Sequence, residues 1–338
     1  MRVGVVGAGQ GSAPHFQSLH DLRDELELAW VIGRSTEKLA ALKLPAGAQA
    51  STRLEDLLGD ASVEAVLILT PPNTHLEIVK RVAMAGKHVL VEKPLEIDLA
   101  KAQQLVDVCD HCGIKLAVML QHRLREAACT LAQLIASGTL GSLVSASASL
   151  RWWRPQSYYD APGRGTLGRD GGGVLMTQAI HTLDLLLCLT GLPDKVSAMA
   201  STSTMHRMEA EDTVAAALHY PCGAIGSIDA TTAAYPGFPE RIALNFTCGS
   251  ATLESGELHA ELMDGRKYEA GRKETTGSGA LFMAFDHQPH RAVLRDFVAA
   301  IRNNTEPAVT GRSALRVHRL IAAIMESAAC GTPVMMKV

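Results

Sequence analysis

The sequence lacks any apolar run approaching the roughly 18–20 residues that a membrane-spanning helix needs. It also lacks an excess of basic charge: the formal net charge is -3 at pH 7, so no basic face for nucleic acid is predicted. Internal repeats, low-complexity tracts and charge blocks are missing as well. These absences argue against nucleic-acid and membrane partners. They leave an ordinary globular protein, as 47% hydrophobic and 20% charged residues indicate.

The cysteines and the first residues bear on the compartment. Seven cysteines are scattered along the chain, which predicts free thiols in a reducing environment. Cys109 and Cys112 form the only C-x-x-C pair, late in an expected helix, whereas redox pairs lie at helix N-termini. The segment from Met1 to Gly7 reads as a strand rather than a signal peptide. A cytoplasmic location without a metal site is therefore expected.

The first third of the chain alternates strands and helices. Strands are expected over 2–6, 27–32, 64–69, 87–91 and 114–120, and helices over 74–85 and 98–112. Alternation at this spacing predicts a parallel sheet with helices on both faces. With 338 residues the chain is long enough for a second domain.

The pattern changes after Gly141. A strand over 142–153, a long polar loop over 154–169 and a glycine-led helix over 171–189 come first. Strands alone follow up to Glu269 at intervals of 8–12 residues, which predicts an antiparallel sheet. Residues 270–286 read as a linker, and helices are expected over 287–302 and 313–329.

A glycine-rich turn follows the first strand. It reads Gly7-Ala8-Gly9-Gln10-Gly11-Ser12 and leads into an expected helix. Strand, small-residue turn and helix N-terminus together can bind the pyrophosphate of a dinucleotide. The third position of the pattern is Ser12 rather than glycine. The turn is weak evidence alone, but it stands at the start of a βαβ run, as the motif requires.

The end of the second strand bears on the choice of dinucleotide. NAD-binding folds usually carry an acid there for the ribose 2′-hydroxyl, whereas an arginine accommodates a 2′-phosphate. This chain has no acid at that point and has Arg34 and Ser35 instead. NADP is therefore favoured over NAD, although an arginine that is merely solvated would leave the preference open.

Two further stretches can carry chemistry. Glu92-Lys93-Pro94 follows the strand over 87–91, which puts an ammonium group at the carboxyl end of a strand, where open α/β sheets bind ligands. The glycine-led helix has Thr177, His181 and Asp184 at i, i+4 and i+7, on one helix face. A lysine and a histidine at one site suit a reaction that moves a hydride and a proton. Separately, each is as well explained as a surface lysine or a core histidine.

Together these residues resemble the Gfo/Idh/MocA family of nicotinamide-dependent sugar and polyol oxidoreductases, over essentially the whole chain. The landmarks are Gly7-x-Gly9, Thr70-Pro71-x-Asn73-x-His75, Glu92-Lys93-Pro94, Gln121-x-Arg123, and Gly171-Gly172-Gly173 followed by His181 and Asp184. The resemblance implies an α/β plus α+β fold, with an N-terminal Rossmann doubly wound parallel sheet and a C-terminal open, mainly antiparallel sheet. The outer face of that second sheet is expected to build a homodimer or homotetramer.

The same resemblance sets the expected domains. A dinucleotide-binding Rossmann domain is expected over 1–122. A substrate-binding and oligomerisation domain with the antiparallel sheet is expected over 123–312. The C-terminal helix and tail over 313–338 are expected to pack back near the Rossmann domain.

The resemblance also implies roles for single residues. Lys93 is expected to be the catalytic lysine and His181 the proton-transfer histidine. Thr177 stands where many members carry Asp; a threonine can hydrogen-bond a hydroxyl but cannot act as a base, and members acting on nucleotide-linked sugars also lack this acid. Cofactor contacts are implied for Gly7, Gly9, Gln10, Arg34, Ser35, Thr70, Pro71, Asn73, His75, Glu92, Lys93 and Gln121. Candidates for holding the substrate are Arg123, Arg154, Tyr158, Tyr159, Arg164 and Asp184.

The expected reaction is hydride transfer between NADP or NAD and a hydroxyl or keto carbon of a sugar, sugar derivative or polyol, nucleotide sugars included. Lys93 would stabilise the developing alkoxide, and His181 would accept the proton. The loop over 154–169 is expected to form a lid or wall for the substrate, with an assembly surface as the alternative. Two rival functions exist for the family: a glycosidase that uses tightly held NAD for transient oxidation, and a nucleotide-binding regulator without catalysis.

Overall fold

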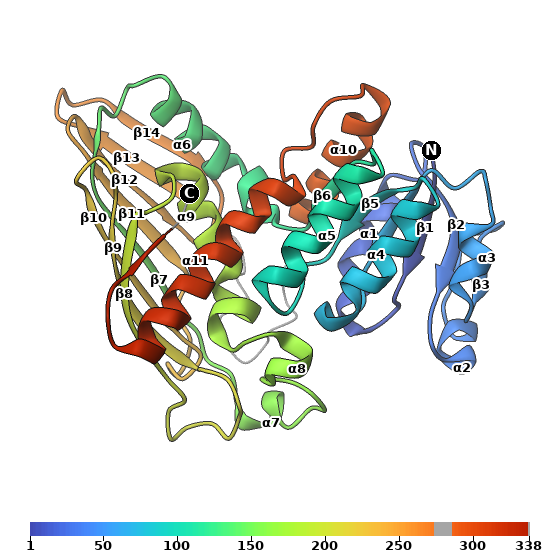
Figure 1. Cartoon of the computed structure of the whole chain (residues 1–338). Helices are drawn as coiled ribbons and strands as arrows, with labels where there is room; N and C mark the ends of the chain where they lie inside the picture. Colours follow the sequence, from blue (N-terminus) through green and yellow to red (C-terminus); the bar gives the residue numbers. More distant parts are fainter. Residues whose placement is uncertain (274–285, 337–338) are drawn as a thin grey trace. The chain divides into compact units, whose positions relative to one another are not determined.

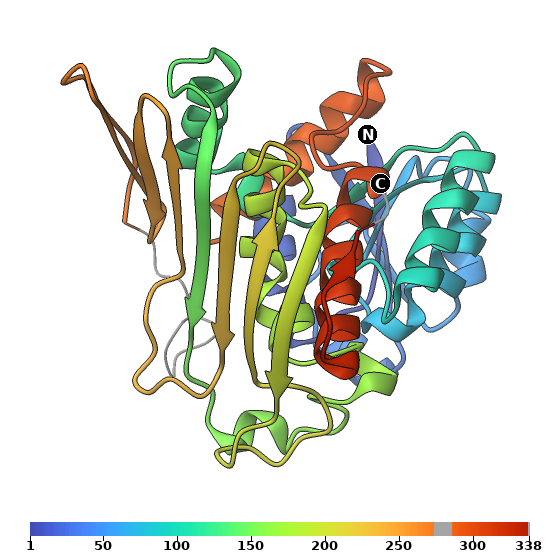
Figure 2. The same ribbon diagram turned by 60° about the vertical axis from the view of Figure 1, so that its left-hand side comes forward.

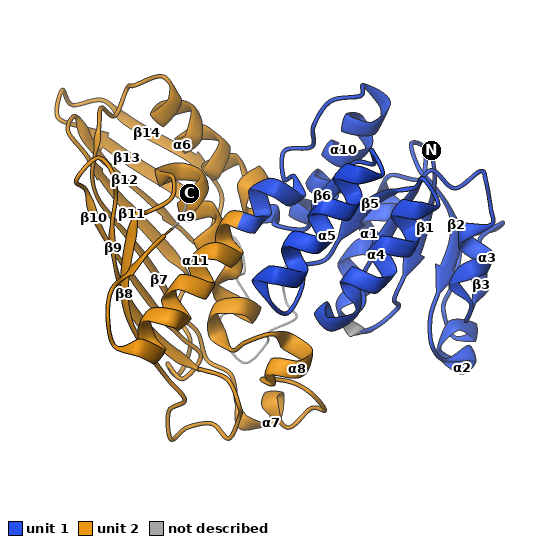
Figure 3. Ribbon diagram, viewed as in Figure 1, with its two compact units in different colours: residues 1–121, 287–315 blue, residues 122–286, 316–338 orange. Residues whose placement is uncertain are grey.

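The computed structural model describes residues 1–273 and 286–336, and the chain divides into two compact units (Figure 3). Unit 1 comprises residues 1–121 and 287–315, and unit 2 comprises residues 122–286 and 316–338. The boundary near residue 121 lies within one residue of the expected limit, but the C-terminal segments differ from the expected division at 312. Most of the expected linker over 270–286 lies outside the described residues.

The C-terminal difference has a physical cause in helix packing. Helix α10 (Gln288–Arg302) contacts α1 (Ala13–Asp21) and β5 (His88–Val91). It buries an apolar stripe that includes Val293, Leu294 and Phe297. The segment therefore completes unit 1, although it follows the second sheet in sequence.

Unit 1 is built on a parallel sheet of six strands in the order β3-β2-β1-β4-β5-β6. Besides β5, the strands are β1 (Arg2–Val6), β2 (Glu27–Ile32), β3 (Gln49–Ser51), β4 (Ala65–Ile68) and β6 (Leu116–Val118). Every neighbouring pair is parallel. This is the strand order of the doubly wound dinucleotide fold, so the predicted Rossmann sheet is confirmed.

Short helices connect these strands. They are α1, α2 (Thr36–Ala40), α3 (Leu54–Leu58), α4 (His75–Met84) and α5 (Leu99–His111). Helices α4 and α5 pack side by side (Figure 1). The central strands β1 and β4 carry apolar runs that are almost wholly buried, as expected for a sheet covered on both faces. The strand order reverses between β1 and β4, which is where such folds bind ligands.

Unit 2 contains a sheet of nine strands in the order β14-β13-β12-β11-β7-β10-β9-β8-β15. The strands are β7 (Leu143–Arg151), β8 (Lys195–Ser201), β9 (Thr213–His219), β10 (Ile225–Thr231), β11 (Arg241–Phe246), β12 (Gly249–Glu254), β13 (Glu257–Leu262), β14 (Lys267–Gly271) and β15 (Val334–Met335). All neighbours pair antiparallel except β7 and β10. The predicted open, mainly antiparallel sheet is confirmed.

The two faces of this sheet differ. Helices α6 (Glu126–Ala136) and α9 (Ile180–Thr190) pack on one face, against β7 and β11 to β14 (Figures 1 and 2). The side chains of β7 alternate accordingly: Ala146, Ala148 and Leu150 are buried, whereas Ser145 and Ser147 on the other face are partly exposed. Helix α11 (Gly311–Cys330) begins in unit 1 and ends in unit 2.

The helical stretch Leu167–Thr190 is the one described segment that is long and apolar enough to cross a membrane. However, 83% of its most apolar window is buried inside the protein. The central leucines of α9 are packed in the core of unit 2. We therefore read it as a core helix, whose apolar character comes from burial.

This stretch is not the single helix over 171–189 that was expected. Helix α8 (Leu167–Asp170) ends at Gly171, which is left-handed with φ 77°. A π-helical segment, η4 (Leu175–Ala179), then leads into α9. A Cβ built at Gly173 would lie 1.6 Å from the carbonyl oxygen of Glu211, so glycine is required where the chain enters the new helix.

Candidate active site

The glycine turn of unit 1 keeps open space beside the start of α1. Gly7 has φ 104°, and a Cβ there would lie 2.9 Å from the backbone of Leu69, so only glycine fits. Apart from its chain neighbours, no described atom lies within 4 Å of a Cβ built at Gly9. Ser12 is buried and its Oγ donates to the Gly9 carbonyl at 2.7 Å. The side chain of Gln10 lies outside what the structure describes.

The turn after β2 carries charges of both signs. Arg34 is exposed. Ser35 caps α2, because its Oγ accepts from the Lys38 N–H at 3.2 Å, and it donates to the Glu37 carboxylate at 2.7 Å. That hydrogen bond lowers the pKa of Glu37. The sequence prediction missed Glu37 because it looked for an acid directly at the strand end.

His75 ties together the loops that leave β4 and β5. Its Nε2 lies 2.8 Å from the Thr70 carbonyl oxygen, and its Nδ1 lies 3.0 Å from that of Pro94. The side chain is fully buried, and burial lowers its pKa. His75 therefore holds the turn that carries Lys93 in place. Each of its two ring nitrogens faces a backbone carbonyl oxygen.

The rest of the β4 exit loop is more open. Thr74 Oγ1 donates to the Pro71 carbonyl at 2.7 Å and forms a hydrogen bond with the Thr70 hydroxyl at 2.8 Å. Asn73 is exposed at the tip of the loop. These residues lie at the carboxyl end of β4, one of the two strands at which the sheet order reverses.

Lys93 follows β5 directly and is half-buried; its peptide bond to Pro94 is cis. The neighbouring Glu92 accepts the Lys93 N–H at 3.0 Å and lies 2.5 Å from His15 Nε2. Burial raises the pKa of Glu92, but the hydrogen bond from His15 and nearby positive charge outweigh it and bring the pKa to about 2. The carboxylate is therefore ionised beside Lys93.

His290 of α10 completes a buried cluster with His15 and Glu92. The two histidine rings meet edge to face at 5.2 Å, and burial lowers the pKa of His290 to about 4. One ligand atom from each residue lies within 4.8 Å of the others, a spacing that could hold a metal ion. The bond between His15 and Glu92 already uses two of these atoms, and Lys93 adds positive charge nearby. We therefore regard the group as a hydrogen-bonded cluster. Its members lie 275 residues apart at the extremes, so the sequence offered no signal for it.

Gln121 is the last residue of the first segment of unit 1. Its side-chain Oε1 is buried and has no hydrogen-bond partner among the described residues. A buried acceptor without a hydrogen bond lowers the stability of the folded protein. An amide N–H from a ligand could supply that hydrogen bond. The carboxamide of a nicotinamide ring is such a donor.

In unit 2, Arg123 and Asp184 bind each other. Arg123 Nε donates to Oδ2 of Asp184 at 2.7 Å, and Nη2 donates to Oδ1 at 2.5 Å. The side chain of Asp184 is 1% exposed. Burial raises its pKa, and the guanidinium of Arg123 opposes that rise. Both had been expected to hold the substrate; the structure joins them in a bidentate ion pair.

The helix face predicted for Thr177, His181 and Asp184 is altered by the π-helical segment. Thr177 lies in η4, where the repeat is wider than in an α-helix. Its Oγ1 donates to the Gly173 carbonyl at 2.6 Å and contacts Gln178 Oε1. His181 lies in α9 and is half-buried. Its ring stacks on that of His122, with centroids 4.9 Å apart and 27° between the planes.

The expected lid loop contains α7 (Gln156–Tyr159) and α8, and it packs onto η4 through Tyr158. Arg164 Nη1 donates to the Tyr158 hydroxyl at 3.0 Å, and its guanidinium lies 4.9 Å from the ring centroid. Gln178 Nε2 donates to the same hydroxyl at 3.3 Å. Tyr158 and Arg164 are thereby linked to Gln178, the residue that follows Thr177 and contacts its hydroxyl.

Arg154 and Tyr159 take more buried places. Arg154 is 3% exposed, and its guanidinium lies 4.9 Å from the centroid of the Trp152 ring; burial lowers its pKa. Tyr159 is buried, and its hydroxyl bonds Thr232 at 2.7 Å. Tyr159 had been expected to face the substrate, but its aromatic ring is turned into the core of unit 2.

The base of this loop is held by a pair that the sequence did not reveal. His206 Nε2 lies 2.8 Å from the Arg154 carbonyl oxygen, and Nδ1 lies 2.7 Å from Asp212 Oδ2. Both side chains are fully buried. Asp212 also accepts from the Ser203 N–H and hydroxyl. His206 and Asp212 lie between β8 and β9, and through the Arg154 carbonyl they hold the start of the loop in place.

Two family models match the chain. The NAD-binding Rossmann-fold model of the GFO/IDH/MocA oxidoreductase family matches residues 1–120, and the GFO/IDH/MocA C-terminal domain model matches residues 129–252. The first model covers the parallel sheet of unit 1, and the second covers β7 to β11 and the first half of β12 in unit 2.

Individual relatives extend over the same length. The WlbA dehydrogenase from Bordetella pertussis, solved with NADH and UDP-GlcNAcA, is 30% identical, with a TM-score of 0.85 and coverage of 100% of this chain and 99% of that chain. WlbA from Chromobacterium violaceum, with the same two ligands, is 28% identical, with a TM-score of 0.87 and coverage of 100% and 96%. The chain spans only 60% and 61% of the lengths of two uncharacterized oxidoreductases of Schizosaccharomyces pombe, each 30% identical over 65% of this chain.

The buried histidine of the cluster predicts how stability depends on pH. The pKa of His290 falls from an ordinary 6.5 to about 4. Between these values the unfolded chain binds a proton that the folded chain does not, so stability should fall as the pH drops from about 6.5 to about 4. Across this window, the free energy of unfolding should fall by at most about 1.4 kcal/mol for each unit by which the pH is lowered.

His290→Phe should therefore show a shallower loss of stability over this range in urea unfolding at pH 7, 5.5 and 4.5. His111→Phe, which replaces an exposed histidine of the same unit, is the matched control and should follow the wild type. The same slope in all three proteins would contradict the assignment.

Proposed function

This chain belongs to the Gfo/Idh/MocA family of NAD-binding oxidoreductases, and from that premise we propose that it transfers a hydride between a nicotinamide dinucleotide and a hydroxyl or keto carbon of a carbohydrate-like substrate. One observation carries the proposal. Lys93 stands directly after β5 at the carboxyl end of a 3-2-1-4-5-6 sheet, and His75 and Glu92 fix its backbone. Ligands of such sheets bind at this edge.

The residues of unit 1 fit the dinucleotide. The open space at Gly9 and the start of α1 suit a pyrophosphate, and the buried Oε1 of Gln121 suits the carboxamide of the nicotinamide ring. Thr70, Pro71 and Asn73 would line the ribose side of the same edge. A bound nicotinamide dinucleotide supplies or accepts the hydride. The protein's own share is to position the reacting groups and to move the proton.

Lys93 and His181 would share the proton chemistry. The ammonium of Lys93 donates a hydrogen bond to the substrate oxygen and stabilises the negative charge that develops there during oxidation. His181 then takes the proton as a general base, or returns it in the reverse direction. Thr177 has its hydroxyl bonded to the Gly173 carbonyl, so we assign it contact with the substrate and no proton transfer.

We infer that the substrate is a sugar that is linked to a nucleotide or bears an acidic group. Arg164 and Tyr158 are joined, and the Tyr158 hydroxyl accepts from Gln178, the neighbour of Thr177 in the chain. The Arg164 guanidinium on an aromatic-rich loop suits phosphate or carboxylate oxygens and stacked rings. Arg154 is buried against Tyr158 and supports the loop. The two WlbA dehydrogenases, similar over the full chain, were solved with UDP-GlcNAcA.

The choice between NAD and NADP depends on the turn after β2. Arg34 favours a 2′-phosphate, whereas Glu37, ionised and held by Ser35, would repel it and could accept a 2′-hydroxyl. We therefore propose NAD as the first cofactor, whereas Arg34 alone had predicted a slight preference for NADP.

We also propose that the outer face of the unit 2 sheet joins copies of this chain. Its middle carries small side chains such as Ser147 and Ala217, and larger apolar ones are exposed, Ile225 at 65% and Met199 at 80%. A flat face of small residues allows another sheet to approach closely.

Ser147→Arg, in the middle of that face, should lower the mass found by sedimentation velocity at micromolar concentration, because it places a charge in a closely packed interface. Arg81→Ala, at an exposed position of helix α4 in unit 1, is the control and should leave the mass unchanged. A monomeric wild type would rule the interface out.

Lys93→Ala tests the proposed chemistry. Turnover should fall by roughly 10²–10⁴-fold, the usual contribution of a positioned catalytic group, while dinucleotide binding stays nearly unchanged because Gly9 and Gln121 are untouched. The assay follows the absorbance of reduced nicotinamide with NAD or NADP across free sugars, polyols, amino sugars and nucleotide sugars. Equal turnover in the variant would remove Lys93 from the mechanism. If no panel member reacts although cofactor binds, the reverse direction is assayed with keto-sugars and reduced cofactor. The NAD-dependent glycosidase and the nucleotide-binding regulator then become the functions to test.

A pair of variants at the β2 turn tests the cofactor. Arg34→Ala should weaken NADP binding more than NAD binding, because it removes a cation from the 2′-phosphate. Glu37→Gln should change the ratio in the opposite direction, by removing a repelling charge. The measurement is the Kd for each cofactor by calorimetry. Equal effects of Arg34→Ala on both cofactors would show that Arg34 does not read the phosphate.

A further inference from the structure

A second histidine ring lies against His181. The centroids of His122 and His181 are 4.9 Å apart, and the ring planes are inclined by only 27°. His122 is 7% exposed, and His181 is half-buried. One face of the proposed proton acceptor is therefore covered by an imidazole.

The charges around this pair decide which protonation states it favours. The charged side chains that the described residues bring to this part of unit 2 are Arg123, Arg125, Asp184, Glu240, Glu254 and Arg316. Arg123 pairs with Asp184, and Arg125 pairs with Glu240 at 3.2 Å. Glu254 is exposed, and Arg316 acts on Asp184 from α11. Both buried carboxylates are thus paired with arginines.

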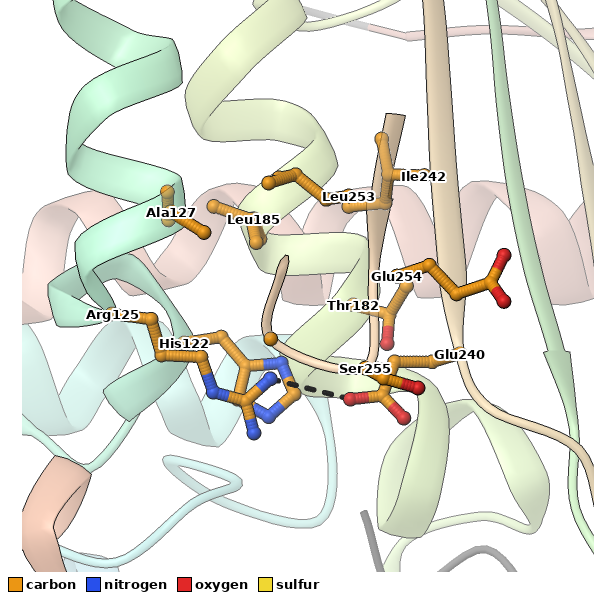
Figure 4. A pocket seen from close by; sticks show the side chains of 12 residues that line it. His122, Arg125, Ala127, Thr182, Leu185, Glu240, Ile242, Leu253, Glu254 and Ser255 are labelled. Carbon is orange, nitrogen blue, oxygen red and sulfur yellow. Dashed lines mark hydrogen bonds and ion pairs between the residues drawn. The ribbon is translucent and has the colours of Figure 1, made fainter. Parts of the chain in front are cut away.

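His122 also lines a pocket of unit 2, together with Arg125, Thr182, Leu185, Glu240 and Ile242 (Figure 4). The pocket holds about 350 Å³ of space, part of which is open to solvent, and its wall combines apolar and polar side chains. Within the described part of the chain, Thr182 Oγ1 and Glu240 Oε2 are buried without a hydrogen-bond partner. Buried polar atoms beside empty space are where ordered water is found. An imidazole suits this place, because its edge tolerates polar neighbours while its face covers another ring.

We propose that His122 is a positioning residue for His181, a neutral ring that holds the imidazole in place and stabilises its protonated form through the ring face. This inference rests on the proposed function, in which His181 takes up the substrate proton. The face of an aromatic ring carries negative charge and attracts a cation stacked upon it. If His122 itself gains a proton in acid, the two rings repel each other and His181 loses this support.

Two substitutions distinguish the effect of the His122 ring from the effect of its protonation. His122→Phe keeps a flat ring and cannot be protonated; His122→Leu has similar bulk and no ring. The readout is the titration midpoint of His181, followed by NMR on protein labelled at histidine, with its signal assigned by its loss in His181→Gln. His122→Leu should lower that midpoint by about 0.5 in pH, the size expected for one stacked ring, and His122→Phe should leave it within about 0.2 in pH of the wild type.

The activity profile gives a second readout. The acid limb of kcat against pH should move to lower pH in His122→Leu with the midpoint of His181, while KM for substrate changes less than kcat. In His122→Phe the acid limb should stay in place and become less steep, because one titrating ring is gone. Identical midpoints in wild type and His122→Leu would overturn the proposal. Equal shifts in both variants would also overturn it, since the contact would then be packing alone.

A folding defect and a functional defect give different results in these measurements. Thermal unfolding of each variant shows whether it folds, and His122→Gln, with a polar edge and no ring, replaces His122→Leu if the latter does not. The NMR midpoint needs no substrate. If the wild type transfers no hydride to any substrate, the proposed function fails, while the midpoint still decides whether His122 supports the protonated form of His181.

Discussion

One buried carboxylate fixes the geometry on which the substrate side of the molecule depends. Glu211 accepts the N–H of Gly173 at 3.0 Å and that of Leu175 at 3.1 Å, and its own carbonyl accepts the Val174 N–H at 2.9 Å. Burial raises the pKa of this carboxyl, and the backbone donors oppose the rise. A helix start has N–H groups without internal partners, and here a side chain from the sheet satisfies them. The helix that carries His181 is thereby tied to the strands beneath it.

Much of this arrangement follows from the sequence. The glycine turn, the buried strands and the spacing of Glu92-Lys93-Pro94 indicate a Rossmann unit with a lysine at its ligand edge, because each is a local pattern with a local cause. The change to short strands after Gly141 indicates the antiparallel sheet in the same way. The family assignment rests on these local signals, and the matched models confirm it.

The sequence could not reveal which polar groups would bind each other. Arg123 and Asp184 were read as substrate contacts because they are polar and near the landmarks, yet opposite charges 61 residues apart can also neutralise each other in the core. Tyr159 turns inward because Thr232, on another strand, offers its hydroxyl a partner. The π-helical turn at Thr177 escapes a periodicity argument, because five residues are too few to separate a wide helix from an ordinary one. Such features depend on tertiary contacts between distant segments.

The interleaving of the two units has a consequence for biosynthesis. When the ribosome has made the first 286 residues, the parallel sheet still lacks α10, which packs on α1 and β5, and the antiparallel sheet still lacks its edge strand β15. Neither unit is complete before residues 287–336 emerge from the ribosome. Until then the nascent chain keeps exposed the apolar surface that α10 covers in unit 1, a state in which large proteins are prone to aggregation. A premature stop in this last segment would damage both units, and the cell would have to clear a chain in which neither half is finished.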